Sequence, residues 1–319
     1  MREILIVKTS SMGDVIQYLP AVTDMHARVP DLAIDWVVEA PFVPLVRLHP
    51  GVRRVIPVAL RSWRKRLLAP ATWSAFGEFR RTLREVRYER VIDAQGLLKS
   101  AVLARMSGAP VAGYMPDSAR EPIATRLYAE KYRVSWQMHA VERNRRLTAA
   151  IFDYRLDLPL DYGIAAPVPG NDAWRPAEPY VVLLTATSRD EKLWPEPNWI
   201  ELGRALNRRG LSCVLPAGSD VERARAQRIA AELSHALVAP PMPLDALAAL
   251  IERAQCVVGV DTGLSHLAAA LKVPVVALYL ATEPGANGVA GGCNAVNLGG
   301  KGQKPSVAQV LQTLAPWVA

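Results

Sequence analysis

The first fifteen residues restrict the fold more than any other stretch of the chain. An apolar run, Ile4-Leu5-Ile6-Val7, leads into the loop Lys8-Thr9-Ser10-Ser11-Met12-Gly13-Asp14, and apolar residues at helical spacing follow. A short β-branched run, a polar turn and helix-period residues are typical of a strand, a loop and a helix. In an open parallel sheet this loop lies at the carboxyl end of the strand, where ligands bind. We therefore expect the loop over 8–14 to carry chemistry.

The same unit recurs through the first half of the chain. Strands are expected over 34–39, over 55–58 and over 90–93, with helical patterns between them. Pro57 indicates an edge strand or a strand end, because proline cannot donate to the strand ladder. Short strands that alternate with helices predict βαβ units and a right-handed parallel sheet.

The second half begins as the first does. The segment Leu156–Pro176 is rich in Pro, Ala, Gly and Asp, which indicates a domain boundary. An apolar run over 180–184 then leads into a hydroxyl-rich loop with a lysine. This repetition predicts an α/β protein with two Rossmann-like domains, 1–160 and 161–319. Packing of the last helix, 306–317, back on the first domain is left open as an alternative.

The third polar strand end follows the buried run Cys256–Val260. The next residues, Asp261-Thr262-Gly263, open a helix in which His266 lies one turn along. Asp or Thr can cap this helix, and the free N–H groups at its start suit a diphosphate. Glu222 also lies near a helix start, and it either binds the hydroxyls of a ribose or is a plain N-terminal acid.

Composition limits the class of protein further. The net charge is +8, with basic residues concentrated at 53–54, 61–66 and 143–146, so an anionic partner is plausible. No helix-turn-helix, RNA-binding or zinc-finger signature appears, so nucleic acid is not expected. No apolar segment reaches the ~20 residues of a membrane span, and no signal-peptide pattern is present. We expect a cytoplasmic protein whose basic surface meets anionic lipid or a phosphorylated or carboxylated substrate.

Several blocks of the chain together match a known family. They are Lys8 to Val15, Trp36 to Glu39, Asp93 to Ser100, Ser118 to Pro122, His139 to Arg143, Asp190 to Trp199 and Asp261 to Leu271. In this order they resemble glycosyltransferase family 9, the lipopolysaccharide heptosyltransferases. The resemblance implies a GT-B architecture, in which two Rossmann-like α/β/α domains face each other across a cleft, the first for the acceptor and the second for the nucleotide sugar. It also implies inverting transfer of L-glycero-D-manno-heptose from ADP-heptose to a Kdo residue of the lipopolysaccharide inner core, with Kdo2-lipid A as acceptor.

The resemblance assigns roles to individual residues. It implies that Asp14 is the general base and that Lys192 stabilises the departing ADP. The implied donor-binding residues are Thr187, Ser188, Lys192, Glu222, Met242, Asp261, Thr262, Gly263 and His266. The expected acceptor-binding residues are Ser10, Ser11, Gly13, Arg61, Arg64, Lys65 and Arg120. The segment 279–284 departs from the family pattern, and Ser188 stands where threonine is expected.

Three further expectations accompany this assignment. No acidic metal-binding motif stands out, so we expect no required divalent cation or other cofactor. We expect peripheral association with the cytoplasmic face of the inner membrane. Gly13 is expected to serve a tight turn that directs Asp14 outward.

Other functions remain open on the sequence alone. The alternative within the family is a sister transferase that adds the second heptose or another sugar. A nucleotide-dependent oxidoreductase could use two Rossmann-like halves, although no GxGxxG follows any predicted strand. A non-catalytic, basic membrane-surface protein is the third possibility, and it leaves the polar loops at three strand ends unexplained.

Overall fold

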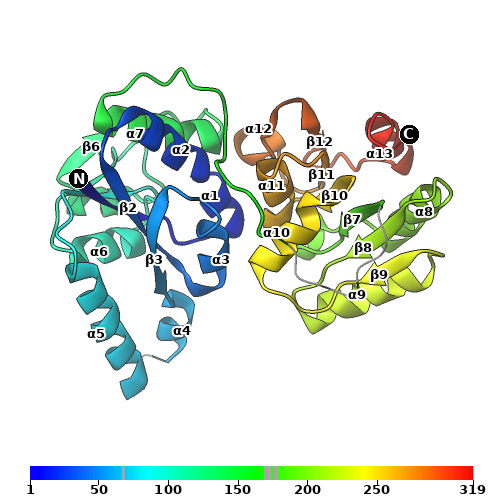
Figure 1. Cartoon of the computed structure of the whole chain (residues 1–319), viewed down its shortest axis with the longest axis horizontal. Coiled ribbons are helices and arrows are strands. Elements are labelled where there is room, and N and C mark those ends of the chain that lie inside the picture. Colours follow the sequence, from blue (N-terminus) through cyan, green and yellow to red (C-terminus); the bar gives the residue numbers. More distant parts are fainter. Residues whose placement is uncertain (67–68, 169–173, 175–178, 319) are drawn as a thin grey trace. The chain divides into compact units, whose positions relative to one another are not determined.

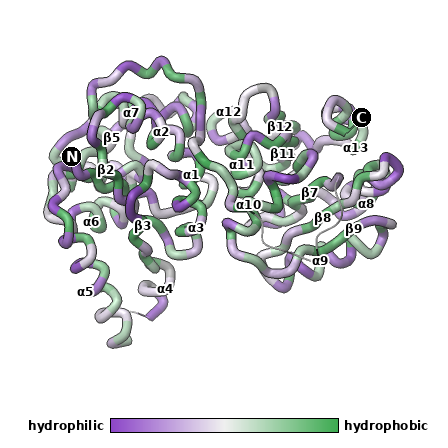
Figure 2. Tube along the Cα trace, in the orientation of Figure 1, coloured by the Kyte–Doolittle hydropathy of each residue, from purple (hydrophilic) through white to green (hydrophobic). Residues whose placement is uncertain are grey.

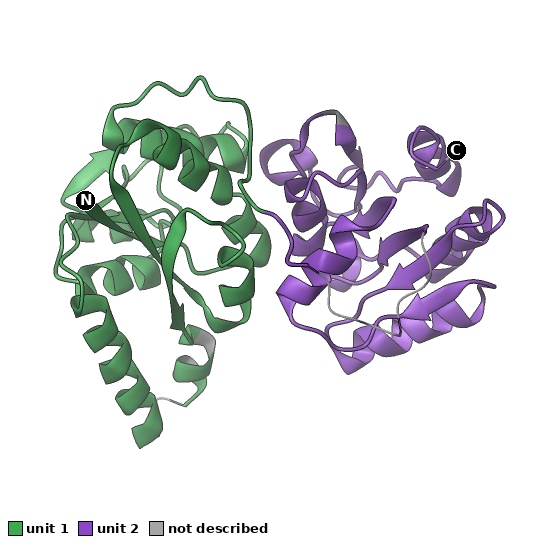
Figure 3. Cartoon of the chain, viewed as in Figure 1, with its two compact units in different colours: residues 1–164 green, residues 165–319 purple. Residues whose placement is uncertain are grey.

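The computed structural model describes residues 1–66, 69–168, 174 and 179–318. The chain forms two compact units, residues 1–164 and 165–319 (Figure 3). We call these unit 1 and unit 2. The sequence placed the boundary at 160/161.

Unit 1 is built on a six-stranded sheet in which every neighbouring pair is parallel. The strands are β1 (Arg2–Val7), β2 (Leu32–Glu39), β3 (Val52–Val58), β4 (Arg90–Asp93), β5 (Val111–Tyr114) and β6 (Glu130–Tyr132). Their spatial order is β3-β2-β1-β4-β5-β6, which is the order of a Rossmann sheet. Figure 1 labels β2, β3 and β6 of this sheet. Pro57 lies in the edge strand β3, as predicted.

Helices cover both faces of this sheet, as alternating strand residues require. The α-helices are α1 (Met12–Ile16), α2 (Leu19–Arg28), α3 (Val43–Val46), α4 (Leu60–Lys65), α5 (Pro70–Arg84), α6 (Leu98–Met106) and α7 (Ala140–Phe152), and the 3₁₀ helices are η1 (Ala40–Phe42) and η2 (Pro122–Leu127). Leu5 and Val7 of β1 pack in one apolar cluster with α5, α6 and η2. On the other face α2 packs against α7, and a buried ion pair between Arg145 and Asp24 (2.7 Å) joins these two helices.

Unit 2 repeats this plan with a second sheet whose pairs are all parallel. The strands are β7 (Tyr180–Leu184), β8 (Ser212–Leu215), β9 (Ala236–Val238), β10 (Cys256–Val260), β11 (Val275–Tyr279) and β12 (Ala295–Gly299). The order β12-β11-β10-β7-β8-β9 is again that of a Rossmann sheet, counted from the other edge. The helices are α8 (Glu196–Asn207), α9 (Asp220–Ala231), α10 (Leu244–Glu252), α11 (Gly263–Ala270), α12 (Pro284–Asn287) and α13 (Val307–Leu314), with 3₁₀ helices η3 (Asp190–Lys192) and η4 (Gly292–Asn294).

The central strands β1, β7 and β10 explain why both sheets form in the middle of their units. These strands are almost wholly apolar and largely buried, and the chain trace in Figure 2 distinguishes such hydrophobic stretches from the polar loops. Near-continuous apolar strands are typical of parallel sheets covered by helices on both faces. The α/β prediction is therefore confirmed for each unit.

The last helix uses its apolar side within unit 2. Val307, Val310 and Leu314 of α13 are buried in the same cluster as Trp194 and Trp199. The Trp194 indole N–H also donates to the carbonyl of Pro305, 2.9 Å away. The buried side of α13 therefore belongs to the apolar core of unit 2. Among the described residues, no helix is long and apolar enough to cross a membrane.

Candidate active site

Each sheet has one position where the strand order reverses direction. In unit 1 the reversal lies between β1 and β4, and in unit 2 it lies between β7 and β10. Ligands of open α/β sheets bind beyond the carboxyl ends of the strands at such a switch point. The loops after these four strands carry most of the predicted site residues, so each unit has a candidate site at its switch point.

Asp14 lies in the first turn of α1, directly after the loop that follows β1. Its Oδ2 accepts hydrogen bonds from the Ser11 N–H (2.8 Å) and from the Ser11 hydroxyl (3.0 Å). Within the described part of the chain, no hydrogen bond occupies Oδ1. A half-exposed carboxylate held by one oxygen and open at the other can accept a proton from a substrate hydroxyl.

The structure corrects the expected role of Gly13. This residue lies inside the first turn of α1, and its φ is not positive. It therefore forms no tight turn of the kind that requires glycine. The orientation of Asp14 comes instead from Ser11, the residue at the N-cap of α1.

The loop after β1 is fastened to the loop after β4 by Gln95. The Gln95 Oε1 accepts hydrogen bonds from the backbone N–H groups of Thr9 (3.0 Å) and Ser10 (3.3 Å). Lys8 strengthens this connection, because its Nζ donates to the carbonyl of Ala94 at 2.8 Å. Gln95 is buried, so these bonds are shielded from water. Gln95 lies in the block Asp93 to Ser100 that carries the family resemblance, and the sequence gave it no role.

Asp93 holds the second loop in shape from a fully buried position. Its carboxylate accepts bonds from the N–H groups of Gln95 (3.0 Å) and Gly96 (3.2 Å), and from the hydroxyls of Ser100 (2.9 Å) and Tyr128 (2.7 Å). Burial raises the pKa of Asp93, and these four hydrogen bonds oppose the rise. With four donors around it, Asp93 has a structural role in the site.

Cations surround the Asp14 loop. Burial lowers the pKa of Lys8, and the charges of Asp14 and Asp93 act against this effect while those of Arg143 and Arg120 add to it. Arg143 stacks on the Trp136 ring at 3.6 Å and donates to the carbonyl of Ser118 at 2.8 Å. The predicted residue Arg120 therefore lies within electrostatic range of this loop, together with Arg143, which the sequence did not single out for the site.

The remaining acceptor candidates lie on α4. Arg61, Arg64 and Lys65 follow the edge strand β3, and Lys65 is exposed. The side chains of Arg61 and Arg64 lie outside the described residues. No hydrogen bond or ion pair of the described residues joins Lys65 to Asp14.

Asp261 is the centre of the second switch point. Its Oδ2 lies 2.6 Å from the Lys192 Nζ and accepts a hydrogen bond from the Thr282 hydroxyl at 2.7 Å. The Thr187 hydroxyl donates to the backbone carbonyl of Asp261 at 2.9 Å. Three loops, after β7, β10 and β11, thus meet at one aspartate. The structure brings together Thr187, Lys192 and Asp261 as predicted, and it adds Thr282.

The start of α11 lies directly after this aspartate. Thr262 occupies the N-cap and Gly263 the first helical position, and among the described residues no side-chain bond from Thr262 caps the helix. Its first N–H groups and the positive end of its dipole are therefore available to an anion. His266 lies in the same helix and is buried.

Glu222 and Met242 lie in other loops of unit 2. The Glu222 carboxylate accepts a bond from the Gly218 N–H (2.7 Å), and the Ser219 hydroxyl accepts one from the Glu222 N–H (3.3 Å). Glu222 thus lies at a helix start with one of its two carboxylate oxygens engaged, which is compatible with both roles suggested by the sequence. Met242 is half-buried just before α10, and Ser188 is exposed. Within the described residues no bond joins these three to Asp261.

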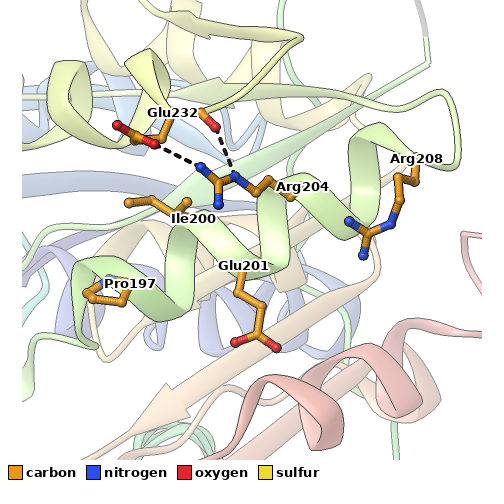
Figure 4. Close-up of a pocket in the computed structure, with 6 residues that line it drawn as sticks. All are labelled: Pro197, Ile200, Glu201, Arg204, Arg208 and Glu232. Carbon is orange, nitrogen blue, oxygen red and sulfur yellow. Dashed lines mark hydrogen bonds and ion pairs between the residues drawn. The ribbon is translucent and has the colours of Figure 1, made fainter.

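One pocket of unit 2 is formed by residues of α8 and its C-cap together with Glu232. It is lined by Pro197, Ile200, Glu201, Arg204, Arg208 and Glu232 (Figure 4). The Arg204 guanidinium and the Glu232 carboxylate pair at 2.8 Å across it. None of the predicted donor or acceptor residues lines this pocket, so it gives no support to a substrate site there.

The comparisons with known proteins agree with this geometry. Residues 76–314 match the family described as glycosyltransferase family 9 (heptosyltransferase). Lipopolysaccharide heptosyltransferase 1 of Pseudomonas aeruginosa is 48% identical over 290 residues, which cover 90% of this chain and 81% of that protein. The structure of E. coli heptosyltransferase WaaC with ADP superposes with a TM-score of 0.91 at 39% identity, covering 98% of this chain and 99% of that one. The same enzyme with ADP-2-deoxy-2-fluoro heptose gives a TM-score of 0.88, with the same identity and coverage. This chain therefore belongs to glycosyltransferase family 9, the heptosyltransferases, and is a glycosyltransferase of GT-B architecture.

Proposed function

We propose that this protein transfers L-glycero-D-manno-heptose from ADP-heptose to a Kdo residue of the lipopolysaccharide inner core. The observation that carries the proposal is the Lys192–Asp261 pair (2.6 Å) beside the uncapped start of α11. A cation and a free helix N-terminus together form a site for a diphosphate. The names of the relatives and the ADP and ADP-sugar bound to the E. coli enzyme support the choice of donor.

Unit 2 supplies the donor site in this proposal. The diphosphate takes hydrogen bonds from the N–H groups at Thr262 and Gly263, while Lys192 provides the positive charge. Glu222 retains one carboxylate oxygen for the ribose hydroxyls, because Gly218 engages only Oε2. Thr187, Ser188, Met242 and His266 complete the nucleotide-sugar site.

Unit 1 supplies the base. Asp14 Oδ1 takes the proton of the attacking Kdo hydroxyl while the hydroxyl oxygen bonds to the anomeric carbon of the heptose. The bond from that carbon to the diphosphate oxygen breaks, and its electron pair leaves with ADP. General-base assistance of this kind contributes about 10²–10⁴ in rate. The developing charge on ADP is stabilised by Lys192 and by α11, so no divalent cation is required in this scheme.

The acceptor carries carboxylates and phosphates, which match the basic side chains of unit 1. Arg61, Arg64, Lys65 and Arg120 are the proposed partners of these anions, and Ser10, Ser11 and Gly13 flank the reacting hydroxyl. Arg120 has the strongest support, because its charge acts on Lys8 next to the Asp14 loop. An acceptor anchored in lipid places the enzyme at the cytoplasmic face of the inner membrane, as a peripheral protein.

A coupled assay of ADP release tests the function. The wild-type protein is given ADP-heptose with Kdo2-lipid A, or with the same acceptor already carrying one heptose. The proposal expects ADP release with the first acceptor and only background release with the second. Release with the heptosylated acceptor alone would assign the protein to the addition of the second heptose instead. A parallel reaction with EDTA should retain full activity if no divalent cation takes part.

A further inference from the structure

One helical layer of unit 1 exposes an unusual number of large apolar side chains. This layer consists of α5, α6 and η2, which pack in one apolar cluster against the sheet. Figure 1 labels α5 and α6 of this layer. Its exposed apolar residues are Trp73 (62% exposed), Leu98 (42%), Val102 (46%) and Ile123 (45%). Leu98 and Val102 lie one helical turn apart on the outer side of α6, because Ala101 and Ala104 point into the core. The layer thus exposes apolar side chains on its outer surface in addition to those that it buries.

The cations of the same layer have no carboxylate partners. Lys99, Arg105 and Arg126 are exposed, and within the described part of the chain none of them forms an ion pair. Elsewhere in unit 1 arginines are commonly paired: Arg2 with Glu89, Arg54 with Asp35 and Glu85, and Arg145 with Asp24. The positive charge of the α6–η2 surface is therefore not neutralised by any ion pair of the described residues. It is available to an anionic partner.

Exposed carboxylates of this layer include Glu121, next to α6, and Glu78 of α5. Glu121 is engaged locally, since its Oε2 accepts the N–H of Leu98 at 2.7 Å. Four exposed side chains of α6, Leu98, Lys99, Val102 and Arg105, thus include two apolar residues and two cations but no acid. Such interleaving suits an anionic bilayer, where apolar groups enter the interface and cations meet phosphates. It suits a second copy of this chain poorly, because two such surfaces would oppose like charges.

The surface also adjoins the loop that orients the base. α6 starts two residues after Gly96, whose carbonyl accepts the N–H of Glu121 at 2.9 Å. Gln95, the preceding residue, holds the backbone of Thr9 and Ser10. Few residues therefore separate the apolar, cationic surface from the segment that carries Asp14.

We propose that the face formed by Leu98, Lys99, Val102, Arg105, Ile123 and Arg126 docks unit 1 on an anionic lipid bilayer. We call these six residues the membrane face. The inference rests on the proposed function and deepens it, because an acceptor anchored in lipid must reach Asp14 from the bilayer. The Gln95 side chain, which holds Thr9 and Ser10, links this face to the loop that carries Asp14. Trp73, Arg80 and Arg81 of the neighbouring α5 are exposed too, as is its acid Glu78, and α5 is joined to α6 by a bond from Arg84 Nε to the Met106 carbonyl (3.1 Å).

Co-sedimentation with vesicles that contain no acceptor tests the charge of the face. The full-length protein is mixed with vesicles of phosphatidylethanolamine and phosphatidylglycerol, or of phosphatidylcholine alone. Each cation at an anionic surface contributes about fivefold to binding, so the double variant Lys99→Gln/Arg126→Gln should bind the anionic vesicles about 25-fold more weakly. The matched control is Arg208→Gln/Arg209→Gln, which removes two exposed cations from unit 2 and should bind as the wild type does.

A second pair of variants tests the apolar contribution. Leu98→Gln/Val102→Gln should lower binding by roughly tenfold, because part of two apolar side chains no longer enters the interface. Val221→Gln/Leu237→Gln, which changes two exposed apolar residues of unit 2, should have no effect. Circular dichroism and thermal melting of each variant establish that it is folded.

The outcomes separate this inference from the proposed function. Wild-type binding no stronger to anionic than to neutral vesicles would overturn it, as would unchanged binding in both membrane-face variants. A wild-type dimer that these substitutions dissociate would assign the face to self-association and overturn the inference too.

ADP release completes the test: the face variants should match the wild type on a water-soluble, deacylated acceptor and lose rate only on an acceptor embedded in vesicles. Equal loss on both acceptors would contradict docking, whereas absence of wild-type ADP release on either would reject the function and leave the vesicle result standing.

Discussion

The ammonium of Lys192 lies 2.6 Å from the carboxylate of Asp261, at the switch point of the unit 2 sheet. Both side chains are largely buried. Asp261 thereby holds the Lys192 ammonium next to the uncapped start of α11. A diphosphate bound there would be stabilised by the ammonium and by the free N–H groups of the helix. An arrangement set before the substrate binds costs little reorganisation during the reaction, which is the usual source of electrostatic catalysis.

Replacement of Lys192 tests this arrangement directly. Lys192→Ala should lower kcat/KM for ADP-heptose by at least about tenfold and weaken ADP binding, because the diphosphate loses its cation and Asp261 is left unpaired. Steady-state kinetics and calorimetric titration with ADP measure the two effects. Arg208→Ala, which removes a distant cation of the same unit, serves as the control. Unchanged kinetics would exclude Lys192 from a role at the leaving group.

Thr282 is expected to position Asp261. Its hydroxyl donates to the same carboxylate oxygen that Lys192 approaches. Thr282→Val preserves the shape of the side chain but removes a hydrogen bond to a charged group, worth about 1.5–3 kcal/mol. We therefore expect kcat/KM to fall about tenfold or more, with recovery in Thr282→Ser. If Thr282→Ser were as impaired as Thr282→Val, the hydroxyl would not be the relevant group.

Gln95 is expected to position the Asp14 loop. Gln95→Leu leaves the buried N–H of Thr9 and the N–H of Ser10 without their acceptor, which should cost about 1–3 kcal/mol of unfolding free energy. Because Asp14 would be oriented less well, kcat should fall while the affinity for ADP remains unchanged. Gln95→Glu keeps an acceptor oxygen and should recover part of kcat. A loss of ADP affinity equal to the loss of kcat would point to general damage instead.

His49 should make the protein less stable in acid. It is buried, its Nδ1 accepts the N–H of Gly51 at 3.0 Å, and burial, assisted by the nearby charge of His26, lowers its pKa to about 4. The unfolded chain binds this proton near pH 6.5, so between pH 6.5 and 4 the unfolded state holds more protons than the native state. The unfolding free energy attributable to His49 should therefore be present above pH 6.5 and fall by about 3 kcal/mol towards pH 4. Denaturant titrations at pH 7 and 4.5 should show a weaker pH dependence in His49→Gln than in the wild type; equal pH dependence would contradict the assignment.

The strands at the centre of each sheet could be predicted from the sequence because they are buried on both faces. The run Ile4-Leu5-Ile6-Val7 and the run Cys256–Val260 are apolar throughout, so they are recognisable without any knowledge of their neighbours. The loops that follow them are predictable for the same reason, since the carboxyl end of such a strand is a binding edge in every sheet of this kind. Two Rossmann-like units follow from these features alone.

The outer strands were missed because they are short and poorly patterned. β6 is only Glu-Lys-Tyr, and β5 contains a glycine, so neither has the alternation or the β-branched content that marks a strand. They become strands because β4 offers an unpaired edge to β5, and β5 in turn offers one to β6. Tertiary pairing, not local preference, decides these segments.

The contacts within the two sites were also not predictable, because they join residues that only the fold brings together. Lys192 and Asp261 are 69 positions apart, and their pairing depends on β7 lying beside β10. Thr282 belongs to a segment that departs from the family pattern, and only the adjacency of β10 and β11 reveals its bond to Asp261. The prediction for Gly13 was wrong. The glycine suggested a tight turn, whereas Ser11 and Asp14 begin a helix there.

The central claim is that Asp14 accepts the proton of the acceptor hydroxyl, and Asp14→Asn tests it most directly. The measurement is kcat with ADP-heptose and Kdo2-lipid A, together with the dissociation constant for ADP. The account predicts a fall in kcat of at least about 100-fold, since the amide cannot serve as a base, and an ADP affinity close to that of the wild type. A variant that keeps more than about a tenth of the wild-type kcat would contradict the assignment of Asp14 as the general base.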